Sequence, residues 1–231
     1  MTQRAELAQA HPEPPMVVTE IEHKFDLSPG FAVPDLSDLT DGGHVGDPEH
    51  HDLDATYYDT ADRRLLTRGI TLRRRSGGAD AGWHLKLPKA AGVRSEVRLP
   101  ADARTSVPPA LTERVVDCTA GAPLLPLARL CTRRTVRTLW DAGGRPLAEL
   151  ALDQVSAWTS APDDESTWSE LEVELVEGDL ALLTAVGERL TRAGASAGRY
   201  PSKLARALDH RSPTHAPRPR ADRPVRSPGP S

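Results

Sequence analysis

Charged residues recur at every second position in one stretch of the chain after another, and this alternation constrains the fold more than any other feature. Side chains of a β-strand point alternately to its two faces, so this period predicts strands with one charged and one apolar face. Glycine-rich turns lie between several of these stretches, which favours antiparallel hairpins. The pattern covers residues 16–25, 53–58, 70–76, 83–88, 93–99, 131–140, 147–155 and 168–176.

Four further stretches have a helical pattern of apolar residues, at 59–68, 109–118, 180–193 and 201–210. Asp179 is suited to cap the start of the third helix, and Gly194 can end it. We therefore expect an α+β fold, in which an antiparallel eight-stranded β-barrel has helices packed outside. The apolar strand faces would lie under those helices.

The signs of the charges indicate what the barrel could enclose. A solvated outer face usually mixes signs, whereas Glu170, Glu172 and Glu174 follow one another on one face and repel each other. Such a row is tolerable beside a divalent cation or a basic neighbour. Carboxylates suit hard cations, and arginine and lysine suit phosphate oxygens. An eight-stranded barrel has room for one slender ligand, so we expect a tunnel that binds a metal-bound polyanion.

With these charged strands the sequence resembles the CYTH family of triphosphate tunnel metalloenzymes. This family includes class IV adenylyl cyclases, thiamine triphosphatases and inorganic tripolyphosphatases. The family's E-x-E-x-K strand matches Glu20-Ile21-Glu22-His23-Lys24. The remaining matches follow in the family's order and extend the resemblance over residues 16–210. They are Tyr57-Tyr58-Asp59-Thr60, Leu72-Arg73-Arg74-Arg75, Trp83-His84-Leu85-Lys86-Leu87-Pro88, Arg94-Ser95-Glu96, Leu150-Ala151-Leu152-Asp153, the row from Glu170 to Glu174, and Ser202-Lys203.

The resemblance implies roles for the matching charged residues. Mg²⁺ or Mn²⁺ would be held by Glu20, Glu22, Glu170, Glu172, Glu174 and Asp153. The phosphates would be bound by Arg73, Arg75, Lys86, Arg94, Arg133, Arg137 and Lys203, with Glu96 and Glu149 completing the lining. Lys24, together with Glu20 and Glu22, would be catalytic, with Lys24 orienting the attacking water or assisting removal of its proton. The choice of Arg133 over Arg134 rests on strand parity and on the spacing to the turn at Asp141.

Composition limits the organisation and the partners. The 231 residues suffice for one domain, which we place at 16–211 between a disordered leader, 1–15, and a disordered Pro/Arg/Ser tail, 212–231. A net charge of -4 gives no general attraction to nucleic acid or to an anionic membrane. Two cysteines and the lack of a long apolar run predict a cytoplasmic protein. We expect a monomer or a homodimer. We expect no appended CHAD-type helical domain, so a polyphosphate-linked partner would be a separate chain.

The resemblance leaves three substrates open. Hydrolysis of inorganic tripolyphosphate to pyrophosphate and phosphate needs only the charged tunnel. Cyclisation of ATP to cyclic AMP also needs contacts to the purine and ribose, for which the sequence has no distinct motif. Thiamine triphosphate needs an aromatic platform, and aromatic residues are only 4% of the chain. We therefore expect a tripolyphosphatase, with a class IV adenylyl cyclase or a thiamine triphosphatase as the alternative.

Overall fold

The computed structural model describes residues 15–40, 42–100, 106–159 and 165–209. It has ten strands, two short 3-10 helices and three α-helices. The strands are β1 (Met16–Asp26), β2 (His44–Val45), β3 (Glu49–Asp59), β4 (Thr71–Ser76), β5 (Gly82–Ala90), β6 (Val93–Pro100), β7 (Leu125–Trp140), β8 (Pro146–Trp158), β9 (Glu165–Leu175) and β10 (Ser196–Ala197). The helices are η1 (Ser37–Leu39), η2 (Leu66–Arg68), α1 (Pro109–Thr119), α2 (Leu180–Arg192) and α3 (Lys203–Asp209).

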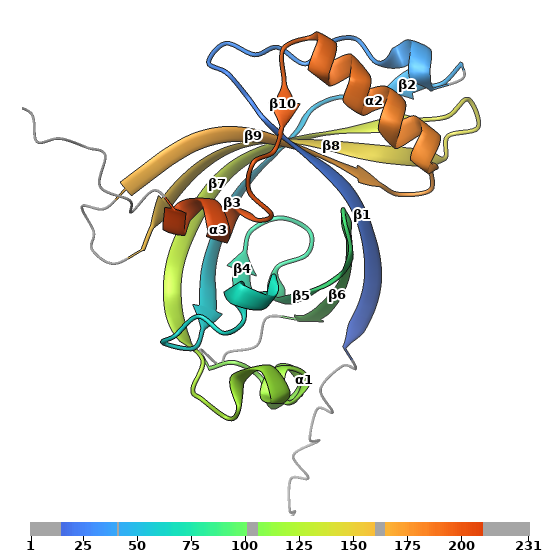
Figure 1. Cartoon of the computed structure of the whole chain (residues 1–231). Helices are drawn as coiled ribbons and strands as arrows, with labels where there is room; N and C mark the ends of the chain where they lie inside the picture. The colour runs from blue at the N-terminus through green and yellow to red at the C-terminus, as the bar shows by residue number, and fades with distance from the viewer. Residues whose placement is uncertain (1–14, 41, 101–105, 160–164, 210–231) are drawn as a thin grey trace, which may run out of the picture.

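The eight long strands form a closed antiparallel ring (Figure 1). Their order is β1-β6-β5-β4-β3-β7-β8-β9, and β9 pairs again with β1. Strand β1 closes the ring by changing partners along its length. Its first half, Met16 to Ile21, pairs with β6, and its second half, Glu22 to Asp26, pairs with β9. The predicted α+β fold on an eight-stranded antiparallel barrel is confirmed, with the two short strands β2 and β10 added at its edges.

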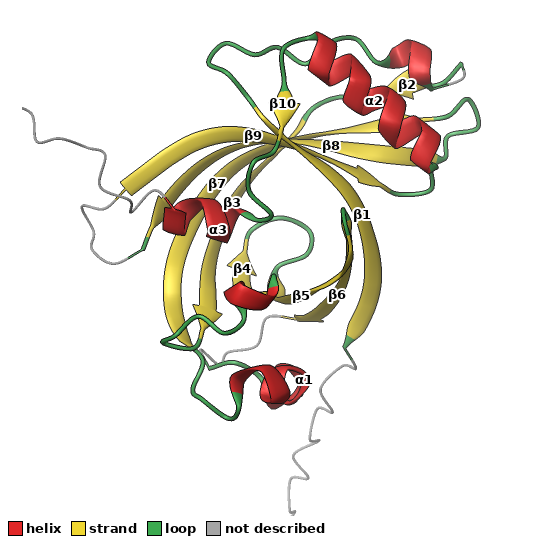
Figure 2. Cartoon of the chain, viewed as in Figure 1, coloured by secondary structure: helices red, strands yellow, loops and turns green. Residues whose placement is uncertain are grey.

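Two helices cover the outer surface of the ring (Figure 2). Helix α1 places Leu111 and Val115 on the outward side chains of β4, β5 and β6, where Leu72 and Leu85 are fully buried. Helix α2 covers the outward side chains of β1, β8 and β9 in the same way, and Asp179 caps its first turn by accepting from Leu182 N at 2.8 Å. The apolar strand faces therefore lie under helices, as their alternation predicts.

The last helix differs from the expectation, because α3 lies on the inner side of the ring (Figure 1). Its Leu204, Ala207 and Leu208 pack against inward-facing side chains of β3, β7, β8 and β9. In these strands the alternating inner positions are apolar at this end, as at Leu130 and Val155. The prediction that all helices pack outside was wrong for α3. Its burial brings its first residue, Lys203, into the ring.

The expected helix at 59–68 is not formed either. The carboxylate of Asp59 instead accepts backbone hydrogen bonds from Thr60 at 2.7 Å, Leu65 at 2.9 Å and Leu66 at 2.9 Å. These bonds fold the segment into turns, and only η2 is helical. An aspartate side chain that competes for backbone N–H groups favours turns over a continuous helix.

None of the helices within the described ranges combines the length and apolarity needed to cross a membrane. The predicted leader, apart from residue 15, and the predicted tail lie outside the described residues.

Candidate active site

The ring encloses a charged cavity of about 70 Å³. Its lining contains eight basic and six acidic side chains, contributed by β1, β4, β5, β6, β7, β9, α3 and the β4–β5 turn. The basic residues are Lys24, Arg73, Arg75, Lys86, Arg94, Arg98, Arg134 and Lys203, and the acidic residues are Glu20, Glu22, Asp80, Glu96, Glu172 and Glu174. The cavity can therefore contact a ligand that carries both phosphate oxygens and a cation.

Strand register brings these side chains to one face. Residues opposite each other in paired strands point to the same side, and Lys24 lies opposite Glu172 where β1 meets β9. Glu20 lies opposite Arg94 where β1 meets β6, and the next strand pair places Lys86 opposite Glu96. Opposite charges thus face each other across three strand pairs. The charged residues that alternate along each strand therefore line up across neighbouring strands and form one continuous inner face.

The first charged group surrounds the β1–β6 pairing. Glu20 is 3% exposed, and its carboxylate lies 2.6 Å from Lys86 Nζ and 3.1 Å from Arg98 Nη2. Glu96 is 1% exposed and lies 3.0 Å from the Nδ1 of His84. Burial opposes ionisation of Glu96, but the hydrogen bond with His84 and the charge of Lys86 lower its pKa overall. Glu96 therefore remains an anion that holds Lys86 and Arg98 in place.

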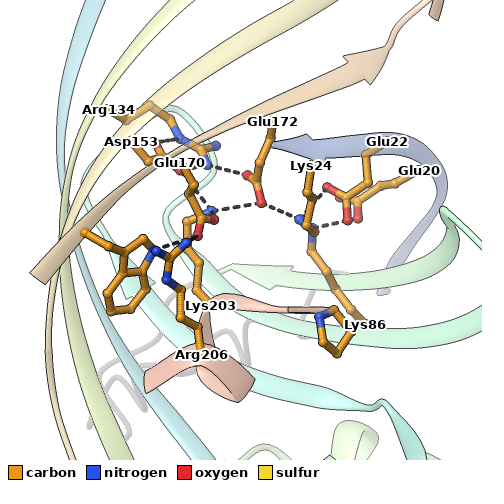
Figure 3. Close-up of polar contacts among 12 residues, drawn as sticks. Glu20, Glu22, Lys24, Lys86, Arg134, Asp153, Glu170, Glu172, Lys203 and Arg206 are labelled. Atoms are coloured by element: carbon orange, nitrogen blue, oxygen red, sulfur yellow. Dashed lines mark hydrogen bonds and ion pairs between the residues drawn. The ribbon is translucent and has the colours of Figure 1, made fainter. Parts of the chain in front are cut away.

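The second group is centred on Glu172 (Figure 3). One of its oxygens contacts Lys24 Nζ and lies 2.8 Å from Lys203 Nζ, and the other lies 2.8 Å from Arg134 Nη2. Burial opposes ionisation, but Lys203, Lys24 and Arg134 hold the pKa of Glu172 well below its usual range. One carboxylate thus connects three cations from β1, β7 and α3.

Lys203 forms three ion pairs in this group. Its Nζ lies 2.9 Å from Asp153, 2.7 Å from Glu170 and 2.8 Å from Glu172 (Figure 3). An ammonium group has three donors, and three carboxylates surround it here. Asp153 is fully buried and is also held by Arg134 at 2.7 Å. Asp153 and Glu170 are therefore neutralised by side chains of the chain itself.

Glu174 differs from these paired carboxylates. It lies directly opposite Glu22 in the β1–β9 pairing. Burial, followed by the nearby charge of Glu20, raises the pKa of Glu174 to about 7, and Glu22 adds to the shift. Glu20, Glu22 and Glu174 thus repel one another on the adjoining strands β1 and β9. Their oxygens are donors suited to a hard divalent cation. Within the described ranges, however, no three acidic, histidine or cysteine side chains are placed so that together they could hold a metal ion.

The third group is an arginine-rich end of the cavity. Arg73 donates to the hydroxyl of Tyr57 at 3.2 Å, and Arg75 pairs with Asp80 of the β4–β5 turn. Burial and the neighbouring Arg73 lower the pKa of Arg75 to about 10. The Nε atoms of Arg73 and Arg75 are buried without a hydrogen-bond acceptor. This end therefore retains donors for an anion.

The structure corrects three site residues. Arg133 is exposed on the outer face, and the neighbouring Arg134 points into the cavity, so the expected parity was wrong. Arg137 is exposed as well, and it lies three positions after Arg134. An odd separation along a strand changes the face, so Arg137 also belongs to the outer face. Glu149 lies opposite Glu174 on the inner face, but it is exposed and does not line the cavity. A run of two arginines cannot reveal which of them faces inward.

Other residues of the site were not among the expected ones. Arg98 shares the alternation of Arg94 and Glu96 and could have been found from it. Arg206 lies three positions after Lys203, so the two share one side of α3. It does not line the cavity, but it pairs with Asp26 and lies 3.8 Å from Glu170. Asp80 lies in a turn, where strand alternation gives no orientation.

Comparison with known proteins agrees with this architecture. Residues 19–208 match the model of the CYTH domain. An uncharacterised protein of Mycobacterium tuberculosis, Rv2226, is 39% identical in an alignment of 221 positions that covers 88% of this chain and 43% of that protein. The same figures hold for the uncharacterised protein MT2285 from another strain of that species. The chain thus spans less than half the length of the curated relatives it matches.

Two solved structures share the fold. One is a Bacillus halodurans protein with a provisional adenylate cyclase assignment, at 18% identity and a TM-score of 0.57, covering 82% of this chain and 97% of that one. The other is HpAC1 from Hippeastrum, a provisional adenylyl cyclase with a dominant triphosphatase activity, at 23% identity and a TM-score of 0.50, covering 83% of this chain and 95% of that one. The chain belongs to the CYTH family.

Proposed function

We propose that this chain hydrolyses inorganic tripolyphosphate to pyrophosphate and phosphate with the help of Mg²⁺ or Mn²⁺. The observation that carries the proposal is the enclosed cavity with eight basic and six acidic side chains. Transfer of a phosphoryl group depends mainly on holding a highly charged chain in line and on neutralising its oxygens. A lining of mixed sign with a surplus of basic groups meets both requirements when a divalent cation is bound.

The basic residues divide into two sets in this proposal. Arg73 and Arg75 bind phosphate oxygens through their forked guanidinium groups, which have free buried donors. Lys86, Arg94 and Arg98 line the same cavity and bind the remaining phosphates. Arg134 and Lys203 act through the carboxylates they contact, so their role is to position Glu172 and Asp153.

Glu20, Glu22 and Glu174 are the proposed holders of the cation, because their mutual repulsion is relieved by positive charge. A bound Mg²⁺ or Mn²⁺ would supply charge neutralisation at the phosphate oxygens. Glu170, Glu172 and Asp153 contribute by fixing Lys24, Arg134 and Lys203.

Lys24 is the proposed residue for orienting the attacking water. Its Nζ lies 3.0 Å from Glu22 and contacts Glu172, so two anchored carboxylates fix its position at the cavity wall. Loss of either carboxylate would leave the ammonium group free to move. In this proposal Lys24 promotes hydrolysis by holding the attacking water in the position from which it can react.

A shared fold with HpAC1, whose dominant activity is that of a triphosphatase, supports hydrolysis over cyclisation. One observation favours the alternative of a substrate with an organic group. A second cavity of about 520 Å³ shares Glu22, Lys24 and Arg94 with the tunnel and is also lined by Tyr200 and Pro201. An aromatic ring beside the tunnel could contact a purine or thiamine. ATP and thiamine triphosphate are therefore the competing substrates.

The test is a panel of tripolyphosphate, ATP and thiamine triphosphate with the purified chain in Mg²⁺ and in Mn²⁺. Phosphate, pyrophosphate and cyclic AMP are measured in every reaction. We expect the highest kcat/KM with tripolyphosphate, equal yields of pyrophosphate and phosphate, and no turnover in EDTA. A higher kcat/KM for formation of cyclic AMP from ATP would replace the hydrolase with a cyclase.

A further inference from the structure

Asp80 brings a carboxylate from a surface turn into the arginine-rich end of the cavity. It lies between β4 and β5, lines the cavity, and pairs with Arg75, which is 6% exposed. Its backbone oxygen accepts from the Nε2 of His84 at 2.8 Å, and the Nδ1 of the same ring lies 3.0 Å from Glu96. A carbonyl oxygen only accepts, so the Nε2 of His84 carries a proton, and burial lowers the pKa of the ring. The turn is thus tied to the wall at two points.

The surrounding charges define what Asp80 does there. Arg134 is neutralised by Asp153 and Glu172, whereas Arg73 donates to the hydroxyl of Tyr57. Arg75 has Asp80 as its ion-pair partner. The carboxylate of Asp80 thus occupies a donor group of Arg75 that phosphate would need. An anion bound at Arg75 and the ionised Asp80 would repel each other at close range.

The cavity size supports the same conclusion. Its volume of about 70 Å³ is far below the roughly 300 Å³ of ordinary ligand pockets. A triphosphate must therefore displace ion pairs that now fill the tunnel. Asp80 is suited to displacement because its side chain is 37% exposed and Gly78, Ala79 and Ala81 beside it are exposed. Gly77 fixes the base of the turn, since a Cβ there would lie 2.0 Å from Asp52 O.

We propose that Asp80 is a resident anion that competes with substrate phosphate for Arg75 and so selects which polyanions bind in the tunnel. This inference rests on the proposed triphosphate site. Only a ligand with enough charge to replace the carboxylate occupies the arginine-rich end. Asp80 is therefore a determinant of specificity, and its removal strengthens binding.

The test measures tripolyphosphate binding by isothermal titration calorimetry in EDTA, where no metal-dependent turnover occurs. Asp80→Asn keeps the size of the side chain and one acceptor oxygen but removes its charge. We expect the Kd of the variant to fall by about tenfold, because a like charge next to the ligand is removed. In an Arg75→Gln background the same change should alter the Kd by about twofold or less. Asp141→Asn is the matched control, since Asp141 is also a turn aspartate paired with an arginine but lies outside the cavity.

An unchanged or higher Kd for Asp80→Asn would overturn the inference and would show that Asp80 positions Arg75 for the ligand. A gain of the same size in the Arg75→Gln background would also overturn it. Asp80→Ser provides a second neutral variant, and thermal unfolding verifies that each protein is folded. If the native chain binds no tripolyphosphate in EDTA, this inference fails, whereas the proposed function fails only if turnover with Mg²⁺ and with Mn²⁺ is absent as well. Tight binding without a gain in Asp80→Asn rejects this inference alone.

Discussion

Glu22 and Glu174 stand directly opposite each other at the point where β1 and β9 close the ring. Like charges opposite one another on a sheet destabilise the pairing. The destabilised pairing is the one that closes the ring, because β1 joins β6 to β9. This pairing is where a divalent cation would benefit the fold as well as the reaction.

The first prediction concerns pH. Glu174 has a pKa of about 7 in the folded chain and an ordinary value of 4.5. The folded state therefore binds this proton more tightly than the unfolded state, so the contribution is fully present below about pH 4.5 and is lost as pH rises through about 7. Glu174→Gln removes the titration. We expect the free energy of unfolding of the variant, relative to the native chain, to rise by about 3 kcal/mol between pH 4.5 and pH 8 in EDTA.

Urea unfolding at a series of pH values measures this difference. Glu177→Gln is the control, because Glu177 is an exposed glutamate three positions later in the chain. A difference that stays constant over the range would show that Glu174 is not destabilised as an anion. Added Mg²⁺ should raise the melting temperature of the native chain more than that of Glu174→Gln at pH 8.

Adjacent arginines on β7 provide a matched pair for the second prediction. Arg134→Gln leaves the buried carboxylates of Asp153 and Glu172 with one cation fewer, which costs about 3 kcal/mol of stability. It should also lower kcat/KM by at least about tenfold, since Glu172 no longer holds Lys24 in place. Arg133→Gln changes an exposed side chain, so its free energy of unfolding should stay within about 0.5 kcal/mol of that of the native chain. A larger loss of stability and activity in Arg133→Gln than in Arg134→Gln would mean that Arg133, and not Arg134, faces the cavity.

Much of the site could be predicted from the sequence because strand alternation fixes the face of a side chain. It grouped Glu20, Glu22 and Lys24 on one face of β1, and the structure brings all three into the cavity. Arg73 and Arg75 follow the same rule on β4. The apolar positions between them, such as Ile21 and Leu72, pack outside as expected.

The rest depends on contacts that alternation does not describe. Arg133 and Arg134 are adjacent, so the parity of β7 is set by its pairing with β8 and not by composition. Helix α3 enters the ring because the strands offer it an apolar inner surface, which a helical pattern alone cannot locate. Asp80 reaches Arg75 from a turn, and turns have no periodicity.

The third prediction concerns the stability of Glu172→Gln. Repulsion between the neighbouring glutamates on β9 would by itself make the loss of this charge stabilising. The structure shows Glu172 between Lys24, Arg134 and Lys203, so the change leaves cations without their common partner. We expect a loss of about 3 kcal/mol in the free energy of unfolding, measured in urea at pH 7. Equal or greater stability would mean that repulsion along β9 dominates after all.

The fourth prediction tests the arginine forks. Arg73→Lys and Arg75→Lys keep the charge but lose the planar pair of donors that matches phosphate oxygens. Each should lower kcat/KM for tripolyphosphate by at least about tenfold, or about 1.4 kcal/mol of transition-state stabilisation. Arg145→Lys, on an exposed turn, is the control and should retain native kinetics. Retained kcat/KM in both tunnel variants would mean that charge alone suffices there.

The central claim is that the tunnel hydrolyses a linear triphosphate, and one competition experiment tests it most directly. Equal concentrations of tripolyphosphate and ATP are incubated with the native chain and Mg²⁺ in one sample, and ³¹P NMR follows all phosphorus species with time. The account predicts that tripolyphosphate is converted first to equal amounts of pyrophosphate and phosphate, while ATP remains and no cyclic AMP forms. Consumption of ATP with the appearance of cyclic AMP, while tripolyphosphate persists, would contradict it.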